Sequence, residues 1–295
     1  ERVEGLGAHE PLRAGCDERD HLVAVLDEQP RQLARLVRRD SSSDPEQNPA
    51  HTRIVPVRTL EEAAAWVDRV GLALVFPKDD LVLPSLWHAA GGVGGEFAER
   101  EPDGTFVRWA APMDFVWHAK DELVEAGLVC GGKHLRGRAS LVSLGVLPAL
   151  VATAAERELP ELEAEIVEVL REHGPLTTRE LPELLPHRER KRVRAAVDRL
   201  QGRMLLTSAG REESTTWPAL IVDLVARRHA ERLREPPSVD EARRILLEKL
   251  LAAAGELSVA DVTGALGWRR ADARAALESL REPTYEEAGV PIWTR

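Results

Sequence analysis

A short segment rich in arginine carries the clearest chemical signal in this sequence. From His187 to Arg203 seven residues are basic and two are acidic, although the whole chain has a formal charge of −10. Guanidinium and ammonium groups bind phosphate oxygens and base edges, so this composition favours contact with nucleic acid. The side chains that we expect to make these contacts are Arg188, Arg190, Lys191 and Arg194. The alternative is a solvated helix face with internal pairs, such as Arg194 with Asp198.

A later segment repeats this pattern. The stretch GPLTTRELPELLPHRERKRVRAAVDRL (Gly174 to Leu200) is similar to GELSVADVTGALGWRRADARAALESL (Gly255 to Leu280), offset by 81 residues before the turn and 80 after it. Each copy predicts a short helix, a tight break and a second helix rich in arginine. That is the layout of a helix-turn-helix, whose second helix lies in a DNA major groove. The equivalent side chains in the later copy are Trp268, Arg269, Arg270 and Arg274, although Trp268 is equally suited to filling a core.

A third basic group falls at the tip of a predicted β-hairpin. The stretch LVCGGKHLRGRASLVSL has two β-prone arms around a glycine-rich tip. This tip contains Lys133, His134, Arg136 and Arg138. Such a tip is suited to entering a DNA groove or following the phosphate backbone. The alternative is an exposed turn that its charges keep soluble.

Aromatic and histidine side chains gather in the first half of the chain. They are Trp87, His88, Trp109, Trp117 and His118. A pocket for a flipped base uses aromatic rings for stacking and a polar group for chemistry, whereas the alternative is that the tryptophans fill a small core. His118 with Asp114 and Asp121 matches no known metal-ligand spacing. We therefore predict no metal and no cofactor, and we assign no catalytic residue.

The hydrophobic periodicity predicts the elements that hold these groups in place. In the first part, Thr59 is placed to cap a helix that Gly71 ends, a strand follows at Leu72–Pro77, and a helix at Pro112–Ala126 precedes the basic hairpin. The later predicted helices are Glu161–His173, Arg179–Leu185, about Arg188–Gln201, one from Pro218, Asp240–Ala254, one capped by Ser258, and Arg269–Leu280. Hairpins are expected after the third and the last of these.

Three helices followed by a hairpin form a winged helix. We therefore expect a mainly α fold with small β-hairpin wings, of the α+β class, built from three tandem winged helix-turn-helix units. The units are expected at residues 52–158, which is the most divergent, 159–236 and 237–295. Residues 1–51 are expected to form an extension and linker, with a helix over Leu22–Val37 that Pro30 interrupts and turn formers over Ser41–Ala50.

The composition argues against several classes of protein. No stretch approaches the about 20 apolar residues that cross a bilayer, and the N-terminus lacks the pattern of a secretory signal. Cys16 and Cys130 lie far apart, which argues against a disulfide framework or a zinc site and fits a reducing cytosol. We expect a cytoplasmic monomer whose partner is double-stranded DNA, damaged or intact, and not a membrane.

Two stretches resemble a known family. They are VRTLEEAAAWVDRVGLALVFPKDDLVLPSLWHAAGG and WHAKDELVEAGLVCGGKHLRGRASLVSL, which resemble the winged-helix proteins related to the AlkZ/YcaQ DNA glycosylases. The resemblance runs from about residue 52 to the C-terminus. It implies three tandem winged helices in a C-shaped body, which excise alkylated bases and unhook interstrand DNA crosslinks through a Gln-x-Gln or Gln-x-Asp motif.

This sequence departs from that motif. Its glutamines are Gln29, Gln32, Gln47 and Gln201, and the residues two positions after them are Arg31, Ala34, Pro49 and Arg203. The resemblance therefore supports the architecture and DNA binding without supplying a catalytic residue. Our first hypothesis is a DNA-binding protein that acts in DNA repair or damage recognition. The alternatives are a DNA glycosylase with a diverged active site, and a protein-interaction scaffold or transcriptional regulator.

Overall fold

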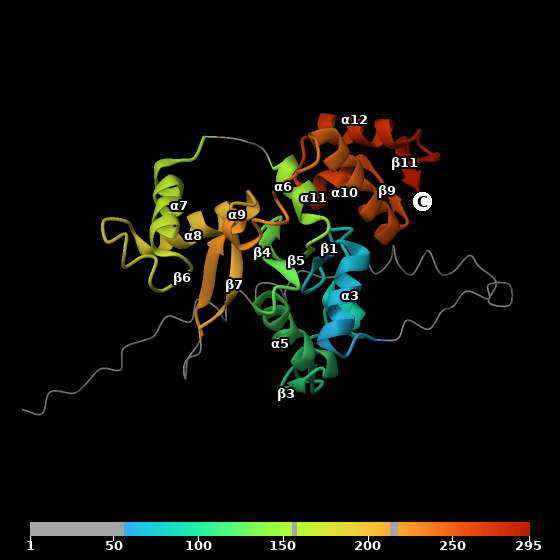
Figure 1. Ribbon diagram of the computed structural model, residues 1–295. Coiled ribbons are helices and arrows are strands. Elements are labelled where there is room, and N and C mark those ends of the chain that lie inside the picture. The colour runs from blue at the N-terminus through green and yellow to red at the C-terminus, as the bar shows by residue number, and fades with distance from the viewer. Residues whose placement is uncertain (1–55, 155–157, 213–217) are drawn as a thin grey trace, which may run out of the picture. The chain divides into compact units, whose positions relative to one another are not determined.

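The chain folds into helices and small antiparallel sheets (Figure 1). The structure, a computed structural model, describes residues 56–154, 158–212 and 218–295. The extension and linker expected at 1–51, including the expected helix over Leu22–Val37, lie outside the described residues. Across the described part of the chain, no helix combines the length and apolar character that a membrane crossing requires.

The first stretch, residues 56–154, builds two small sheets and four helices among its described residues. The helices are α3 (Leu60–Val70), α4 (Leu86–Ala89), α5 (Ala111–Glu125) and α6 (Leu147–Thr153). The strands are β1 (Leu72–Leu74), β2 (Ala98–Arg100), β3 (Phe106–Trp109), β4 (Val129–Leu135) and β5 (Arg138–Ser143). Thr59 caps α3 through a reciprocal bond with Glu62, and Gly71 ends the helix at a φ of 79°, which confirms both predicted boundaries.

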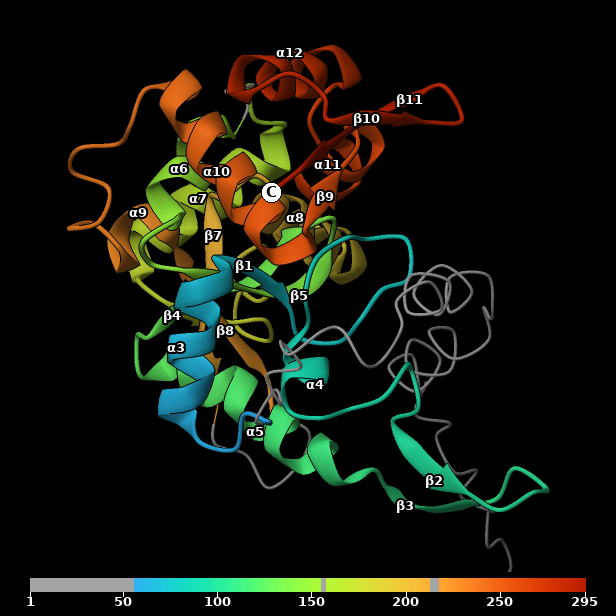
Figure 2. The same cartoon turned by 90° about the vertical axis from the view of Figure 1, so that its right-hand side faces the viewer.

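The β2–β3 hairpin was not predicted from the sequence. Figure 2 shows it extending away from the neighbouring helices, and its two strands pair only with each other in the described residues. The other sheet of this stretch has the strand order β1-β5-β4 and contains the predicted basic hairpin. Leu135 pairs with Arg138 at the tip of that hairpin, so Arg136 and Gly137 form a two-residue turn.

The second stretch, residues 158–236, contains one predicted helix that does not form. Its elements are α7 (Glu161–His173), β6 (Leu176–Thr177), α8 (Arg190–Gly202), β7 (Leu206–Arg211), β8 (Leu220–Leu224) and α9 (Val225–Arg228). Residues 178–183 form successive turns in place of a helix, and residues 184–185 are not helical either. Thr177 and Glu180 make the reciprocal bonds of a helix start, but Pro182 lacks the N–H that a continuing helix needs. The helix predicted from Pro218 is also wrong in part, because its first half is strand β8.

The third stretch, residues 237–295, follows the prediction closely. Its elements are α10 (Val239–Ala254), β9 (Glu256–Leu257), α11 (Val259–Leu266), α12 (Arg270–Leu280), β10 (Tyr285–Glu287) and β11 (Val290–Thr294). Ser258 caps α11 by a reciprocal bond with Asp261, as its position predicted. Gly267 ends α11 in the left-handed conformation and opens the turn into α12.

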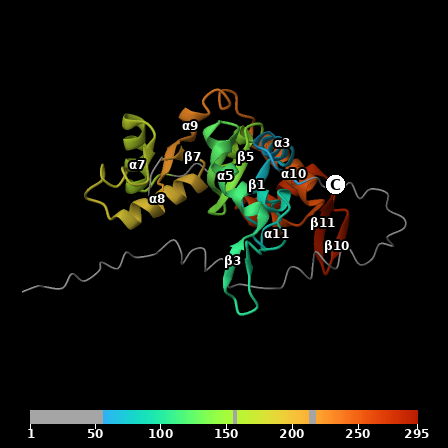
Figure 3. The ribbon, with the colours of Figure 1, turned by 90° about the horizontal axis from the view of Figure 1, so that it is seen from below.

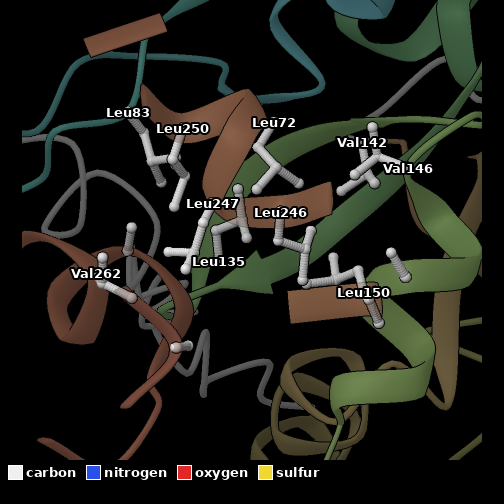
Figure 4. Close-up of a cluster of buried hydrophobic side chains, with 14 of the residues drawn as sticks. Leu72, Leu83, Leu135, Val142, Val146, Leu150, Leu246, Leu247, Leu250 and Val262 are labelled. Atoms are coloured by element: carbon white, nitrogen blue, oxygen red, sulfur yellow. The ribbon is translucent and has the colours of Figure 1, made fainter. Parts of the chain in front are cut away.

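Buried apolar side chains form three clusters in the described residues. One lies among α3, α4 and α5, and another among α7, α8, β7 and β8. The largest is shared between the β1-β5-β4 sheet with α6 and the helices α10 to α12. Figure 4 shows its centre, where Leu72, Leu135 and Val142 face Leu246 and Leu250. The first and third stretches are therefore joined by a common core, whereas α8 rests mainly on a core of its own stretch.

Candidate nucleic-acid interface

The α8 helix separates apolar and basic residues on opposite faces. Its buried side chains recur at helical spacing and are Val193, Ala196, Val197 and Leu200. Arg190, Lys191 and Arg194 are exposed on the other face. Within the described residues none of these three makes an ion pair or a side-chain hydrogen bond. Three cations without an anionic partner, held on one rigid helix, are suited to binding phosphate groups.

Arg188 differs from these three cations because it is already paired. It precedes α8 and donates to both carboxylate oxygens of Glu165, at 3.0 and 2.6 Å, while Glu161 lies 2.9 Å away. The hydrogen bond from Arg188 holds the pKa of the Glu165 carboxyl below its usual range. Arg188 therefore ties the start of α8 to α7, and it is less available to phosphate than the three residues that follow it.

The pair Arg194–Asp198, which was the alternative expected on α8, does not form. Asp198 instead accepts from the ammonium of Lys133 on the β4–β5 hairpin, at 2.8 Å. Beside it, the backbone N–H of Lys133 donates to the Oε1 atom of Gln201 at 2.5 Å. The hairpin is therefore attached directly to the exposed side and the end of α8. Gln201 was not singled out from the sequence for this role.

The structure corrects the expectation that His134 faces DNA. Its side chain is buried, and its Nδ1 atom lies 3.0 Å from the carbonyl oxygen of Gln201. Because a carbonyl only accepts, Nδ1 carries the hydrogen, and burial lowers the pKa of His134, which favours the neutral ring. A buried ring offers nothing to a phosphate. His134 helps to hold the hairpin against α8 instead.

The tip of the β4–β5 hairpin remains basic and exposed. Arg136 and Arg138 are both exposed, and neither has an acidic partner among the residues that the structure describes. Arg136 lies over the turn between α11 and α12, since a Cβ atom placed on Gly267 would be 3.4 Å from its Nη1 atom. Figures 1 and 3 show the hairpin between the α7–α8 pair and the helices α10 and α11. The tip thus connects the two arginine-rich segments in space.

The α12 helix carries fewer free cations than α8. Arg270 and Arg274 are exposed and, within the described ranges, have no acidic partner. Arg269, the residue before α12, is paired with Asp272 in the first turn of the helix at 2.8 Å. Trp268 is half-buried against the shared core and lies under Arg243, which agrees with the alternative that it fills a core.

The aromatic and histidine residues of the first stretch do not converge on one pocket. Trp87 is fully buried, and its indole N–H donates to the carbonyl of Gly94 at 3.0 Å. Trp109 is 54% exposed on β3, whereas Trp117 on α5 lies under Lys120. His118 is exposed on α5, with its Nδ1 atom 2.7 Å from the carbonyl of Asp114 in the preceding turn. His88 is also exposed, on α4. The alternative of tryptophans as core residues holds for Trp87.

Two comparisons with known proteins found a similarity. The profile of a family described as DNA glycosylase AlkZ-like matches residues 115–294. Among solved structures, the DNA glycosylase AlkZ of Streptomyces sahachiroi has a similar fold, with a TM-score of 0.50 and 18% sequence identity over 82% of this chain. The chain spans 66% of the length of that protein, just under two thirds. At this identity the likeness concerns the fold alone. A comparison with curated proteins gave no match.

Proposed function

The chain belongs to the AlkZ-like DNA glycosylase family, and from this premise we propose that it binds double-stranded DNA through tandem winged-helix units in DNA repair or damage recognition. The observation that carries the proposal is the exposed face of α8, where Arg190, Lys191 and Arg194 have no anionic partner within the described residues. The protein has a net charge of −10, so a local face of this kind decides where a polyanion binds.

The order of elements supports the winged-helix interpretation. In the third stretch the helices α10, α11 and α12 precede the β10–β11 hairpin, and in the second stretch α7, a series of turns and α8 precede the β7–β8 hairpin. In this layout α8 and α12 are the recognition helices that enter the major groove. The β4–β5 hairpin adds Arg136 and Arg138 beside them as a wing, while Lys133, which is paired with Asp198, holds the hairpin against α8.

The size of the electrostatic effect gives the proposal a quantitative test. Each phosphate contact contributes about −0.9 to the slope of log K against log salt for duplex DNA. Replacing Arg190, Lys191 and Arg194 together by Ala is expected to weaken binding about a hundredfold near 0.1 M salt and to flatten this slope by about 3. The effect should be similar for different DNA sequences, because phosphate contacts carry little sequence information.

A charge-matched variant supplies the control. Replacing Arg69, Arg100 and Arg234 by Ala removes three positive charges from other exposed positions. We expect this variant to bind like the natural sequence, with fluorescence anisotropy over a salt series as the measurement for both. Equal binding by the two triple variants would remove α8 from the interface. Absence of binding at low salt would favour the protein-interaction scaffold.

Glycosylase activity is the second candidate function, because the family description names it. The exposed ring of Trp109 is available to stack on a base that has left the duplex. Of the four glutamines, only Gln201 is described, and it is committed to holding Lys133 and His134. Release of free base from alkylated or crosslinked duplexes tests this candidate. Release would assign the chain an activity, whereas salt-sensitive binding without release would favour recognition alone.

A further inference from the structure

The turn of the β4–β5 hairpin holds an arginine in a backbone conformation that side chains disfavour. Arg136 has a φ of 55° and Gly137 a φ of 71°, which are the values of a type I′ turn. Glycine, asparagine and aspartate are the residues that tolerate the first position of such a turn. An arginine there costs conformational free energy, and its side chain has no acidic partner among the described residues.

The last hairpin provides an internal comparison. Its two-residue turn has the same form, with Ala288 at a φ of 50° and Gly289 at 78°. The two turns therefore share their backbone geometry and differ in charge. Position 288 carries a methyl group and follows the acidic residues Glu286 and Glu287, whereas Arg136 lies in a basic tip.

Arg136 also occupies a particular place between the two arginine-rich helices. Lys133, three residues before Arg136, is bonded to Asp198 on α8. The guanidinium of Arg136 lies over Gly267 at the entry to α12. Two consecutive major-groove segments on one face of a duplex are separated by the minor groove. The minor groove is about 6 Å wide, which excludes a helix but admits one extended side chain.

We propose that Arg136 is the residue through which the β4–β5 hairpin enters the minor groove of the duplex that α8 and α12 hold. This inference rests on the proposed function, and it adds a preference among duplexes. A·T-rich segments have a narrow minor groove whose negative potential attracts arginine. The protein therefore binds a site with a central A·T-rich segment more tightly than one with a central G·C segment.

The experiment compares three proteins on two duplexes. The duplexes have equal length and identical flanks, with a central A-tract in one and a G·C segment in the other. The proteins are the natural sequence, Arg136→Asn, and the control Ala288→Asn. The control places asparagine at the same left-handed turn position in the β10–β11 hairpin. The natural sequence is expected to prefer the A-tract about tenfold. Arg136→Asn loses this preference, because its affinity falls more on the A-tract duplex than on the G·C duplex, while Ala288→Asn keeps both the preference and the affinity.

Thermal unfolding separates this role from a structural one. Asparagine fits the left-handed turn better than arginine, so Arg136→Asn is expected to melt no lower than the natural sequence while its A-tract affinity falls. Netropsin, which fills A·T minor grooves, should compete with the natural protein and leave Arg136→Asn unaffected on the A-tract duplex.

Four outcomes would overturn the inference. They are equal affinity of the natural protein for both duplexes, unchanged A-tract preference in Arg136→Asn, an equal loss on both duplexes, or a lowered melting temperature with unchanged preference. The proposed function fails separately, if the natural protein binds neither duplex at low salt.

Discussion

The α8 and α12 helices come from similar sequence segments, but they differ in charge and in support. Three adjacent cations of α8 are free of acidic partners in the described structure, whereas on α12 Asp272 neutralises Arg269. The hairpin after α12 begins with Tyr285, Glu286 and Glu287, so negative charge lies next to that unit. The two helices also rest on different cores. Under the proposed function, this difference predicts a main contact with DNA at α8 and a weaker one at α12.

The largest effect, on the free energy of unfolding, should come from a destabilising substitution in each of the two cores. Leu200 of α8 and Leu277 of α12 are both fully buried, and replacing either by Ala is expected to cost about 2–5 kcal/mol of unfolding free energy. Leu200→Ala should speed amide exchange in α7 and α8 and spare α10. Leu277→Ala should speed it in α12 and in the β1-β5-β4 sheet together, because they share a core. Exchange that rises equally everywhere in both variants would show one cooperative unit.

The next largest effect is expected from lowering the pH, which should destabilise the surroundings of His229 before it destabilises the third stretch. Burial, together with Arg228 and His134, lowers the pKa of His229 to about 4, against the opposing charge of Asp223. The unfolded chain takes up this proton first, near pH 6.5, so stability is lost as pH falls from 6.5 towards 4. The third stretch contains no histidine. Amide protection factors near β4 and α9, which correct for the intrinsic pH dependence of exchange, should therefore fall between pH 7 and pH 5 before those in α12 do, and His229→Asn should reduce the difference.

The smallest effect is expected from α12 itself. Replacing Arg270 and Arg274 by Ala should weaken binding to duplex DNA roughly fivefold and flatten the salt slope by less than 2. The α8 triple variant should lose about a hundredfold in the same titration. A larger loss from the α12 pair than from the α8 triple would reverse the assignment of the main contact.

Several local signals in the sequence were sufficient to predict structure. Thr59 and Ser258 each stand before an apolar helical pattern with an acidic residue three positions on, and both form capping boxes. The basic hairpin was also predictable, because β-prone arms surround its glycines. In contrast, Pro182 stops the helix that the pattern from residue 179 predicted, although Thr177 and Glu180 supply the start of one.

Features that depend on distant partners were not predictable. His134 lies in a basic run, but it is buried because Gln201, which is 67 residues away, offers a carbonyl to its ring. Likewise, Asp198 is bonded to Lys133 in another hairpin and not to Arg194 in its own helix. Helical spacing cannot reveal such pairs, since tertiary contacts compete with neighbours along the helix for the same carboxylate. The β2–β3 hairpin, around an acidic loop, carries too weak an alternation to be recognised.

The bond between Gln201 and the backbone of Lys133 holds the β4–β5 hairpin against α8. Under the proposed function the two elements form a bivalent DNA ligand. We then expect the hairpin contact to form at a high effective concentration once α8 has bound a duplex. Avidity of this kind slows dissociation, because both elements must leave together. Replacing Gln201 should therefore remove no contact with DNA itself, but it should shorten the residence time of the complex.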